Sequence, residues 1–366
     1  MPREVVIVGG ARTPFAVWRR GRTGDGKRGG ALAKDHPFDL GADACRAALV
    51  KTGVSPESVD FLVFGNVYQI GPNACYGGRY VSLRAGLAPE LPSLTVNMAC
   101  GTGLSALISA SREIVAGGVD TVLSVGADTA SLIDKSIFIP SFHDQACGRE
   151  IGETVQTLAA REGIDRAAMD AWSLESHRRA RAARDFQREE IVGDGIDDAV
   201  LEDPGPEAFA NAKVAHEGAV TSRNTHAIVD GASALVLSAT RLDGALGLLL
   251  ASATVGIEPD RMGVASVAAI KKLLTEAARS VEEIDLFEIN ETFAAQLLLD
   301  IRELNIPKEK VNVNGGGIAF GHPFAATGGK LVLGLLLELG RRGLKTGVAS
   351  ICVGGGLGVA VLVERL

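Results

Sequence analysis

Short apolar runs alternate along the chain with longer stretches in which apolar residues recur every three or four positions. Several of the short runs are apolar almost throughout, which is typical of strands that are covered on both faces. The runs that predict strands are residues 4–10, 60–66, 94–98, 121–127, 232–239, 248–255, 285–290, 310–314, 347–353 and 358–366. The helical spacing predicts helices over residues 40–53, 104–118, 264–278 and 330–343. The alternation of the two patterns predicts an α/β protein.

The two ends of the chain resemble each other. The stretch CRAALVKTGVSPESVDFLVFGN is similar to IKKLLTEAARSVEEIDLFEIN, and both run from a predicted helix through a turn into a predicted strand. Three pairs of residues correspond in the same order and at similar spacing: Asp60 with Asp285, Val96 with Val311, and Ser124 with Ser350. This order indicates a duplicated α/β unit, since chance similarity is the weaker explanation of three ordered matches.

The region between the two similar parts has a different composition. From Thr129 to Thr225 the chain is richer in charged residues and in helical patterns, and its last part is rich in turn-forming residues. We therefore expect an inserted, mostly helical subdomain. The expected organisation is a first half over residues 1–128 that is completed by about 226–255, the subdomain over 129–225, and a second half over 256–366.

Composition narrows the partners and the compartment. The 366 residues carry a formal net charge of −7, which argues against a general nucleic-acid or acidic-membrane surface. The longest apolar run near the C-terminus is too short to insert across a membrane. The 5 cysteines are odd in number, no pair has CxxC spacing, and the first residues lack a signal-peptide layout. These features predict no disulfide framework and no metal site, and they favour a reducing, cytoplasmic compartment.

Cys100 is the first candidate for chemistry. It stands in VNMACGTGLSAL, between a predicted strand and a predicted helix. Free backbone N–H groups at a helix N-terminus favour a thiolate, and a strand-to-helix turn is one way in which folds present a nucleophile. The glycines at 101 and 103 allow a tight turn and the close approach of a ligand. Its position alone does not exclude that Cys100 is a buried structural thiol, because free cysteines are commonly buried.

The second half carries a histidine at the corresponding edge. His322 lies in VNVNGGGIAFGHPFAATGGK, between a glycine and a proline and before a predicted helix. In a pseudo-symmetric pair of units such edges can converge, and this histidine could then take the proton from a cysteine of the first half. A structural or merely exposed histidine is the alternative.

Two more strand ends carry candidate groups. Cys352 enters the triple-glycine turn of SICVGGGLG, whose backbone N–H groups could form an oxyanion hole or could simply allow close packing. Asn290, in EINETFA, could cap the following helix or position a water or a substrate oxygen. All these groups follow strands at their C-terminal ends, which is the edge where α/β sheets bind ligands.

The four ordered motifs NMACGTGL, NETFAAQ, GGGIAFGHPFAATGG and CVGGGLG resemble those of the thiolases, the acetyl-CoA acyltransferase family. ARTPF and VTSRNTHAIVDGASALVL also fit, so the resemblance covers essentially the whole chain. It implies two similar halves in duplicated αβαβα layers, with an inserted helical loop subdomain for CoA. It also implies reversible acyl transfer between CoA thioesters, with acyl-CoA and CoA as substrates and no permanently bound cofactor. A homodimer or homotetramer is implied as well, with the sheet edges near NMAC contributing.

The resemblance assigns a role to each candidate. Cys100 resembles the nucleophile that takes the acyl group, and His322 resembles the base that activates it. Cys352 resembles the acid/base that deprotonates the α-carbon of the second acetyl-CoA, or protonates the leaving acetyl-CoA in thiolysis. Asn290 would hold a water that, with His322, binds the thioester oxygen of the enolate. The backbone N–H groups of Cys100 and Gly354 would bind the oxyanion formed on the acyl-enzyme.

Five further positions are implied to contact the substrate. Met262 and Phe293 resemble residues that line the pantetheine tunnel. Ile151 stands where many relatives have methionine in the pocket wall, and His226 stands where a serine commonly contacts CoA. Phe324, in GHPFAATG, is closer to variants of fatty-acid oxidation thiolases than to the GHPIGASG pattern, which leaves the acyl chain length open.

Three other functions compete with this interpretation. A decarboxylating 3-ketoacyl synthase shares the fold and the nucleophilic cysteine, but its family lacks the cysteine of CVGGGLG. A non-catalytic binding protein on the same scaffold is disfavoured by the presence of all four catalytic side chains. A nucleotide-binding dehydrogenase would need GxGxxG after the first strand, where only Gly9 and Gly10 are present.

Overall fold

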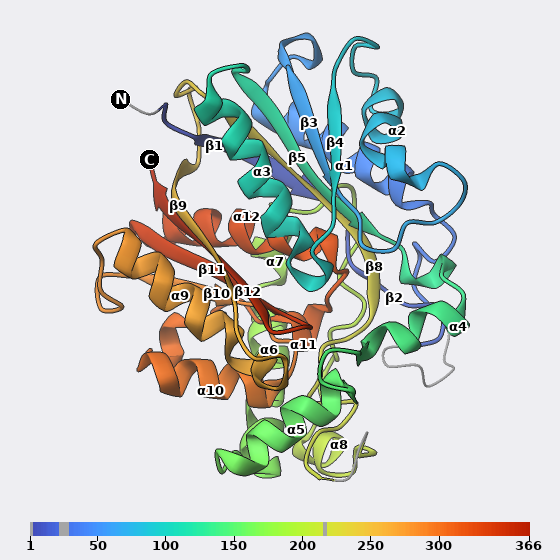
Figure 1. Cartoon of the computed structure of the whole chain (residues 1–366), viewed down its shortest axis with the longest axis vertical. Coiled ribbons are helices and arrows are strands. Elements are labelled where there is room, and N and C mark those ends of the chain that lie inside the picture. The colour runs from blue at the N-terminus through green and yellow to red at the C-terminus, as the bar shows by residue number, and fades with distance from the viewer. Residues whose placement is uncertain (1–2, 22–28, 215–217) are drawn as a thin grey trace.

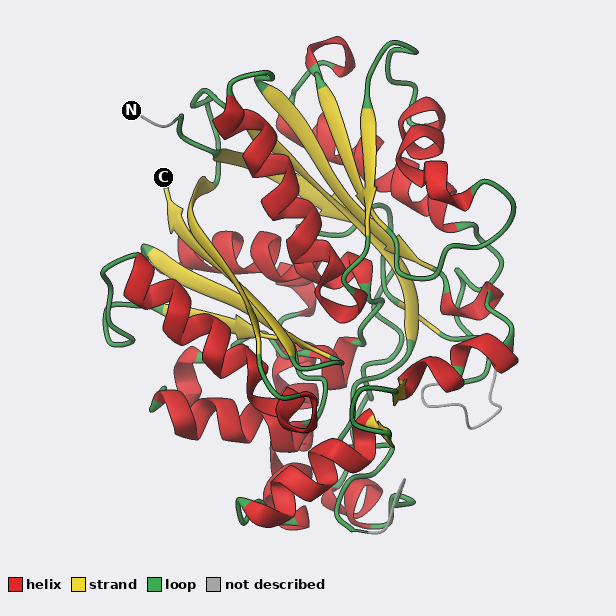
Figure 2. Cartoon of the chain, viewed as in Figure 1, coloured by secondary structure: helices red, strands yellow, loops and turns green. Residues whose placement is uncertain are grey.

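The computed structural model describes residues 3–21, 29–214 and 218–366, which form a mixed α/β molecule (Figures 1 and 2). Ten strands form one sheet with the order β10-β11-β12-β9-β1-β8-β5-β3-β4, and β2 pairs with β8 outside this path. The strands of the sheet are β1 Val6–Arg12, β2 Ala16–Val17, β3 Phe61–Gly65, β4 Ser93–Val96, β5 Thr121–Asp128, β8 Val229–Ser238, β9 Gly247–Gly256, β10 Leu286–Ile289, β11 Thr346–Val353 and β12 Leu357–Arg365. The predicted α/β class is confirmed.

The two parts of the sheet repeat one pairing pattern. β3 is parallel to β4 and β5, and β5 then meets β8 in antiparallel pairing. In the second part β10 is parallel to β11, which meets β12 in antiparallel pairing. β1 and β9, the last strands of the two series, pair with each other at Val6 and Ile7. The predicted duplication is therefore visible in the strand order.

The predicted strand over residues 310–314 is wrong. Only Val311 forms an isolated bridge, with Phe287, and Asn312 turns the chain with a left-handed backbone at φ 47°. The Asn312 side chain accepts the Ile289 N–H through Oδ1 and donates through Nδ2 to the Ile289 carbonyl oxygen, both at 2.8 Å. A side-chain amide thus satisfies the backbone groups that a neighbouring strand would pair with.

The four predicted helices are present. They correspond to α1, α3, α9 and α12, and α1 starts earlier than predicted because Pro37 occupies the first turn and the His36 ring caps it. α12 also starts earlier, at Ala325, because its glycines are helical. The helices are α1 Pro37–Thr52, α2 Gly77–Arg84, α3 Thr102–Ala116, α4 Lys135–Phe138, α5 Ile151–Arg161, α6 Arg166–Ala182, α7 Arg184–Gln187, α8 Pro206–Ala210, α9 Ala265–Glu276, α10 Ala294–Leu304, α11 Gly317–Phe320 and α12 Ala325–Arg342.

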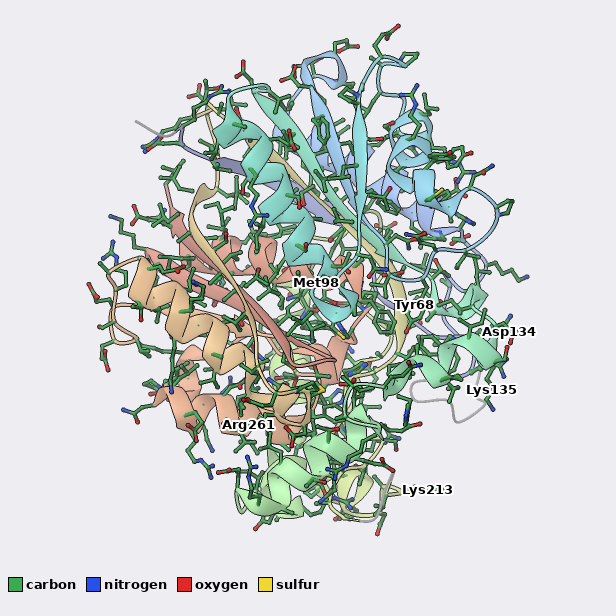
Figure 3. All side chains as sticks on the ribbon, in the orientation of Figure 1. Tyr68, Met98, Asp134, Lys135, Lys213 and Arg261 are labelled. Carbon is green, nitrogen blue, oxygen red and sulfur yellow. The ribbon has the colours of Figure 1, made fainter. Side chains whose placement is uncertain are left out.

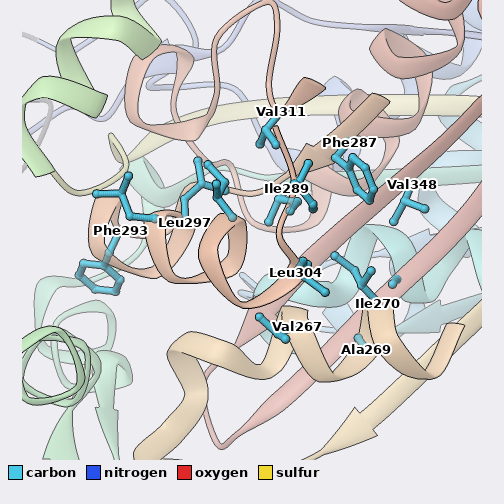
Figure 4. Packing of buried hydrophobic residues seen from close by; sticks show 14 of the residues in the cluster. Val267, Ala269, Ile270, Phe287, Ile289, Phe293, Leu297, Leu304, Val311 and Val348 are labelled. Carbon is cyan, nitrogen blue, oxygen red and sulfur yellow. The ribbon is translucent and has the colours of Figure 1, made fainter. Parts of the chain in front are cut away.

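The helices divide the molecule into layers. α3 and α12 contact strands of both halves and form the central layer, whereas α1 covers the outer face of the first half and α9 that of the second. The core of the second half packs β10, α9 and α10 together, for instance through Phe287, Ile270 and Leu297 (Figure 4). Each such fully buried side chain stabilises the fold by about 1.5–3 kcal/mol. These contacts confirm the expected αβαβα layering.

The segment between β5 and β8 carries α4–α8 and the small hairpin of β6 (His143–Asp144) and β7 (Arg149–Glu150). Arg12 of β1 anchors the part of this segment between α7 and α8, because its buried guanidinium pairs with Glu190 at 2.6 Å and with Asp197 at 2.8 Å. β9 pairs along its length with β12 and only at two positions with β1. The division into two halves and a subdomain stays a prediction.

The central helices cross at a point where only glycine fits. A Cβ at Gly103 of α3 would lie 2.7 Å from the backbone nitrogen of Gly328 of α12, and a Cβ at Gly328 would lie 2.8 Å from the Gly103 Cα. The helix N-termini therefore approach each other at backbone contact (Figure 1). Because Cys100 precedes α3 and His322 precedes α12, this contact brings the two loops together.

We expect Gly328→Ala to destabilise the protein, because the added methyl group meets backbone atoms that cannot rotate away. Overpacking of this kind costs about 1–3 kcal/mol, so the urea midpoint of unfolding should fall. Gly340→Ala in the same helix is the matched control, since its Cβ would meet only the Arg365 Cδ at 3.7 Å. There alanine should be neutral or stabilise by up to about 1 kcal/mol. Equal midpoints for the two variants would contradict the proposed contact.

Candidate active site

Cys100 lies in the tight turn between β4 and α3, within a short 3₁₀ helix over Ala99–Gly101. Asn97 Oδ1 accepts the Ala99 N–H at 3.0 Å, and the Met98 N–H donates to Thr102 Oγ1 at 2.7 Å. Ala99 has a left-handed backbone at φ 44°, which is strained for a residue with a Cβ and persists only where its surroundings hold it. The turn presents Cys100 beside the N-terminus of α3, as the sequence predicts.

The Cys100 thiol is protonated at neutral pH. Burial raises its pKa to about 11, although the backbone N–H groups of Cys100 and Gly354 act in the opposite direction because they stabilise a thiolate. These N–H groups are therefore close to the sulfur. The same donors can hold an oxyanion that develops on a group attached to this sulfur.

His322 is buried in the loop before α12. Its ring Nδ1 is hydrogen-bonded to Thr327 Oγ1 at 2.6 Å, and its backbone N–H donates to the Ala227 carbonyl oxygen at 3.0 Å. Its Nε2 is buried and has no hydrogen-bond partner within the described residues. Burial, with a smaller contribution from His226, lowers the pKa of His322 well below its usual range. The ring is therefore neutral, and its free Nε2 can accept a proton when Nδ1 carries the hydrogen.

Asn290 follows β10 and is fixed on both sides. Its N–H donates to the Ser350 carbonyl oxygen at 2.9 Å, and its Nδ2 donates to Thr292 Oγ1 at 3.1 Å. Its Oδ1 is buried and unpaired in the part of the chain that the structure describes. The helix-capping alternative is wrong, because the N–H groups of Thr292 and Phe293 donate to Gln296 Oε1 instead.

Cys352 is the next-to-last residue of β11 and is fully buried. Its Sγ lies 3.4 Å from Thr292 Oγ1. Burial and, secondarily, the nearby Asp300 carboxylate raise the pKa of the Cys352 thiol far above its usual range. The turn that follows needs glycine, because Gly355 and Gly356 have φ values of 79° and 76°.

The first half meets the second in two directions around Cys100. Toward the sheet, a Cβ at Gly101 would lie 2.9 Å from a side chain at the end of β11, and the Gly354 N–H acts on the sulfur. Toward α12, Cys100 packs in one apolar cluster with Phe324, whose ring centroid lies 5.3 Å from that of His322. The predicted convergence of the two edges is confirmed.

A cavity of about 240 Å³ lies beside the place where the loops with Cys100 and His322 meet. Its lining includes Ile151, His226 and Phe293. The other two expected substrate contacts do not line the cavity but are buried in clusters that pack against its lining. Met262 packs in a cluster with Ile151 and the next-to-last residue of β11, and Phe324 packs among aromatic rings. Three of the five predicted substrate contacts thus share one cavity.

His226 connects the cavity with His322. The two rings are edge-to-face, with centroids 5.1 Å apart and planes at 89°. The His226 N–H donates to the Thr292 carbonyl oxygen at 3.2 Å, and its Nδ1 lies 3.1 Å from the same oxygen. The histidine at this position therefore has a fixed ring and forms part of the cavity wall.

Aromatic side chains enclose the other side of Cys100. Tyr68, Phe138 and Phe324 contact one another, with ring centroids 5.1–6.0 Å apart. Cys100 packs against this aromatic cluster. Figure 3 labels Tyr68 of the cluster and Met98 of the turn that carries Cys100. The surroundings of the sulfur are therefore mainly apolar, which explains the raised pKa of the Cys100 thiol.

Sequence reasoning missed the hydroxyl residues that orient the site. Thr292 joins Asn290 to the β11 cysteine, and Thr327 holds His322 Nδ1. Both threonines stand inside motifs that the sequence already singles out, NETFAAQ and GHPFAATGG. In the sequence, the available signal for the two threonines was their closeness to Asn290 and His322 rather than any local pattern.

Among the described residues, no helix is long and apolar enough to cross a membrane. No group of three or more His, Cys, Asp or Glu side chains in the same ranges could hold a metal ion.

Family models describe both parts of the chain. The N-terminal domain of thiolase matches residues 5–241, and the C-terminal domain of thiolase matches residues 244–365. The chain belongs to the thiolase family. An acetyl-CoA acetyltransferase of Chromobacterium violaceum is 37% identical over an alignment that covers 94% of this chain and 97% of that protein. The human mitochondrial 3-ketoacyl-CoA thiolase is 32% identical over an alignment that covers 99% of this chain and 98% of that protein.

Solved thiolases have the same fold. The crystal structure of human mitochondrial 3-ketoacyl-CoA thiolase in complex with CoA superposes with a TM-score of 0.91 at 31% identity, covering 100% of this chain and 98% of that one. The crystal structure of a Bacillus anthracis acetyl-CoA acetyltransferase also has a TM-score of 0.91, at 29% identity, covering 100% and 99%. The sequence resemblance to thiolases, acyltransferases that act on CoA thioesters, is thereby confirmed.

We expect the alkylation of Cys100 by iodoacetamide to accelerate steadily as the pH rises from about 7 to 10. The reason is that the pKa of this thiol is raised to about 11, so the reactive thiolate gains about tenfold for each pH unit below that value. Peptide mass spectrometry at timed intervals measures the rate, and a Cys100→Ser variant identifies the labelled peptide. A rate that is already constant above neutral pH would instead indicate a preformed thiolate–imidazolium pair.

Proposed function

We propose that this thiolase transfers acyl groups reversibly between two CoA thioesters through an acyl-enzyme on Cys100. The products are acetoacetyl-CoA in condensation, and acetyl-CoA with a shortened acyl-CoA in thiolysis. The observation that carries the proposal is that the turn with Cys100 packs against β11 and α12, while Thr292 joins Asn290 to Cys352. His322 Nε2 and Asn290 Oδ1 are buried without partners in the described chain. Such unpaired buried atoms cost free energy unless a ligand or water satisfies them.

The first step is acylation. Cys100 Sγ attacks the carbonyl carbon of acetyl-CoA while its proton passes to His322 Nε2, and the N–H groups of Cys100 and Gly354 hold the oxyanion. The carbon–sulfur bond to CoA then breaks, and the CoA sulfur takes the proton from the imidazolium. CoA leaves, and an acetyl group remains on Cys100 as a thioester.

The second step forms the carbon–carbon bond. Cys352 first gives its thiol proton to the neutral His322 ring. The Cys352 thiolate then removes a proton from the α-carbon of a second acetyl-CoA, and the electrons move onto the thioester oxygen of the enolate. A water on Asn290 Oδ1, together with His322, stabilises that oxygen. The enolate carbon attacks the acetyl carbonyl, the bond to Cys100 Sγ breaks, and the His322 imidazolium returns its proton to Cys100, which restores two thiols and a neutral imidazole.

The electrostatics favour a neutral resting site. Burial raises the pKa values of both Cys100 and Cys352 and lowers that of His322, so both thiols keep their protons and the imidazole stays neutral. Charge develops only when a substrate is bound, where the backbone donors stabilise it without reorganisation. This arrangement suits an acyl transfer whose intermediate must be protected from water.

We infer that CoA occupies the cavity beside His226. Its walls contain Ile151 and Phe293, which suit the apolar part of a pantetheine arm, and its volume of about 240 Å³ suits part of a CoA molecule rather than the whole. The aromatic cluster that includes Phe324 would limit the space for an acyl chain attached to Cys100. Acetoacetyl-CoA is therefore the proposed first substrate to test.

A decarboxylating ketoacyl synthase is the alternative acyltransferase. It would take a malonyl group from a carrier protein and would not need a base for an α-proton. The buried Cys352, hydrogen-bonded within the site at 3.4 Å from Thr292, favours the thiolase reaction. Activity with a malonyl carrier and acetyl-CoA, combined with none on acetoacetyl-CoA and CoA, would reverse this preference.

We expect Cys100→Ala to abolish both acyl labelling and thiolysis, since no other group can form the thioester. Radiolabelled acetyl-CoA followed by peptide mass spectrometry measures the labelling, and loss of absorbance of acetoacetyl-CoA in the presence of CoA measures thiolysis. The rate should fall on the order of 10³-fold or more. Cys75→Ala, at an exposed free cysteine, is the matched control and should retain both activities. Thiolysis that persists in Cys100→Ala would refute the acyl-enzyme.

We also propose a homodimer or homotetramer in which β4 pairs with its copy in a second chain. β4 is the edge strand of the sheet and pairs only with β3 among the described strands, and its Leu94 is 42% exposed. An unpaired apolar edge invites pairing with another chain. Light scattering should give twice or four times the chain mass, and Leu94→Arg should lower it. A monomer at micromolar concentration would contradict the proposal.

A cytoplasmic location is the compartment that we propose. All five cysteines are free, and Cys352 in particular must be reduced to act as a base. Cell fractionation followed by a thiolysis assay tests the location. Activity confined to an oxidising compartment would contradict it.

A further inference from the structure

Thr292 is the centre of the hydrogen bonds in the second half of the site. Its buried Oγ1 lies 3.1 Å from Asn290 Nδ2 and 3.4 Å from Cys352 Sγ. Its N–H donates to Gln296 Oε1 at 3.1 Å, and its carbonyl oxygen accepts the His226 N–H at 3.2 Å. One hydroxyl therefore contacts both Asn290 and Cys352.

The directions of these hydrogen bonds follow from the groups involved. An amide NH₂ can only donate, so the Thr292 oxygen accepts from Asn290 Nδ2. The single hydroxyl hydrogen of Thr292 is then free to point at the sulfur of Cys352. Because Asn290 Nδ2 is held in this way, its Oδ1 is left turned away from Thr292 and unpaired.

We propose that Thr292 is a positioning residue whose hydroxyl donates a hydrogen bond to the Cys352 thiolate and keeps Asn290 Oδ1 directed into the site. The proposal rests on the proposed function of Cys352 as the base. When Cys352 takes the α-proton of the second thioester, a carbon–hydrogen bond breaks and a sulfur–hydrogen bond forms. Thr292 keeps its own proton throughout, so it stabilises the base without entering the proton transfer.

The backbone at Thr292 is held independently of its hydroxyl. Gln296 Nε2 donates to the buried Asp300 carboxylate, which also accepts the Ser266 Oγ hydrogen at 2.7 Å. This contact turns Gln296 Oε1 toward the Thr292 N–H. Replacement of the hydroxyl by a methyl group therefore leaves the backbone supports in place, so Thr292→Val isolates the hydroxyl.

The experiment follows the exchange of the acetyl-CoA methyl protons in D₂O by NMR, in a Cys100→Ser background that cannot form the acyl-enzyme. A hydrogen bond to a charged group changes the ionised fraction of a thiol by about tenfold or more. Without that hydrogen bond the thiolate is rarer but more basic, so part of the loss in exchange rate is recovered. Thr292→Val should slow the exchange by about three- to tenfold at every pD, which displaces the pD profile in parallel. Thr292→Ser should restore the rate.

Two controls separate the possible failures. Exchange that persists in Cys352→Ala, in the same background, would show that the proposed base is wrong, whatever Thr292 does. With Cys100 intact, the release of CoA during acylation should change far less than the exchange in Thr292→Val. The proposal is overturned if exchange in Thr292→Val equals that of the parent, if acylation falls by the same factor as exchange, or if Thr292→Ser is as slow as Thr292→Val.

Discussion

The contact between Gly103 and Gly328 is the constraint on which the site depends. Cys100 and His322 lie on loops of different halves, and each loop leads into one of the two central helices. The loops meet only because the helix N-termini approach at backbone distance, which a single Cβ on either glycine would prevent. The duplicated fold thus supplies two similar strand-to-helix turns, and the glycines bring them into one reaction centre.

Burial determines the charge state of the groups in that centre. Apolar surroundings keep the cysteines as thiols and the histidine as a neutral ring, which avoids isolated charges in a region of low dielectric constant. The cost is that nucleophile and base must be activated when substrate binds. Backbone N–H groups at Gly354, the unpaired atoms of Asn290 and His322, and the Thr292 hydroxyl are the groups available to stabilise the charges that then form.

Much of the fold could be predicted from the sequence because apolar periodicity reflects burial directly. The four principal helices follow from it, whereas the strand expected over residues 310–314 fails. The reason is that Asn312 replaces strand pairing by side-chain hydrogen bonds to Ile289, and a local pattern cannot distinguish the two. α12 likewise starts earlier than its apolar spacing predicts, because the small size of Gly328 reflects a contact with α3 rather than a turn.

For the site, the sequence motifs predicted Cys100, His322, Cys352 and Asn290 as candidates. They did not reveal which neighbouring groups hold these side chains in place. Thr292 and Thr327 became visible only through the distances that their hydroxyls make. The cavity likewise includes Ile151, His226 and Phe293 but excludes Met262 and Phe324. Such distinctions depend on side-chain direction across the fold, which spacing along the chain does not encode.

In the proposed reaction both halves of the molecule act on one acyl group bound to Cys100. A crystal structure of the protein soaked with acetyl-CoA and frozen before turnover would show where that group is attached. We expect an acetyl group on Cys100 Sγ, with its oxygen held by the N–H groups of Cys100 and Gly354 and a water between Asn290 Oδ1 and the site. An acetyl group on another residue, or a thioester oxygen that points away from those N–H groups, would contradict it.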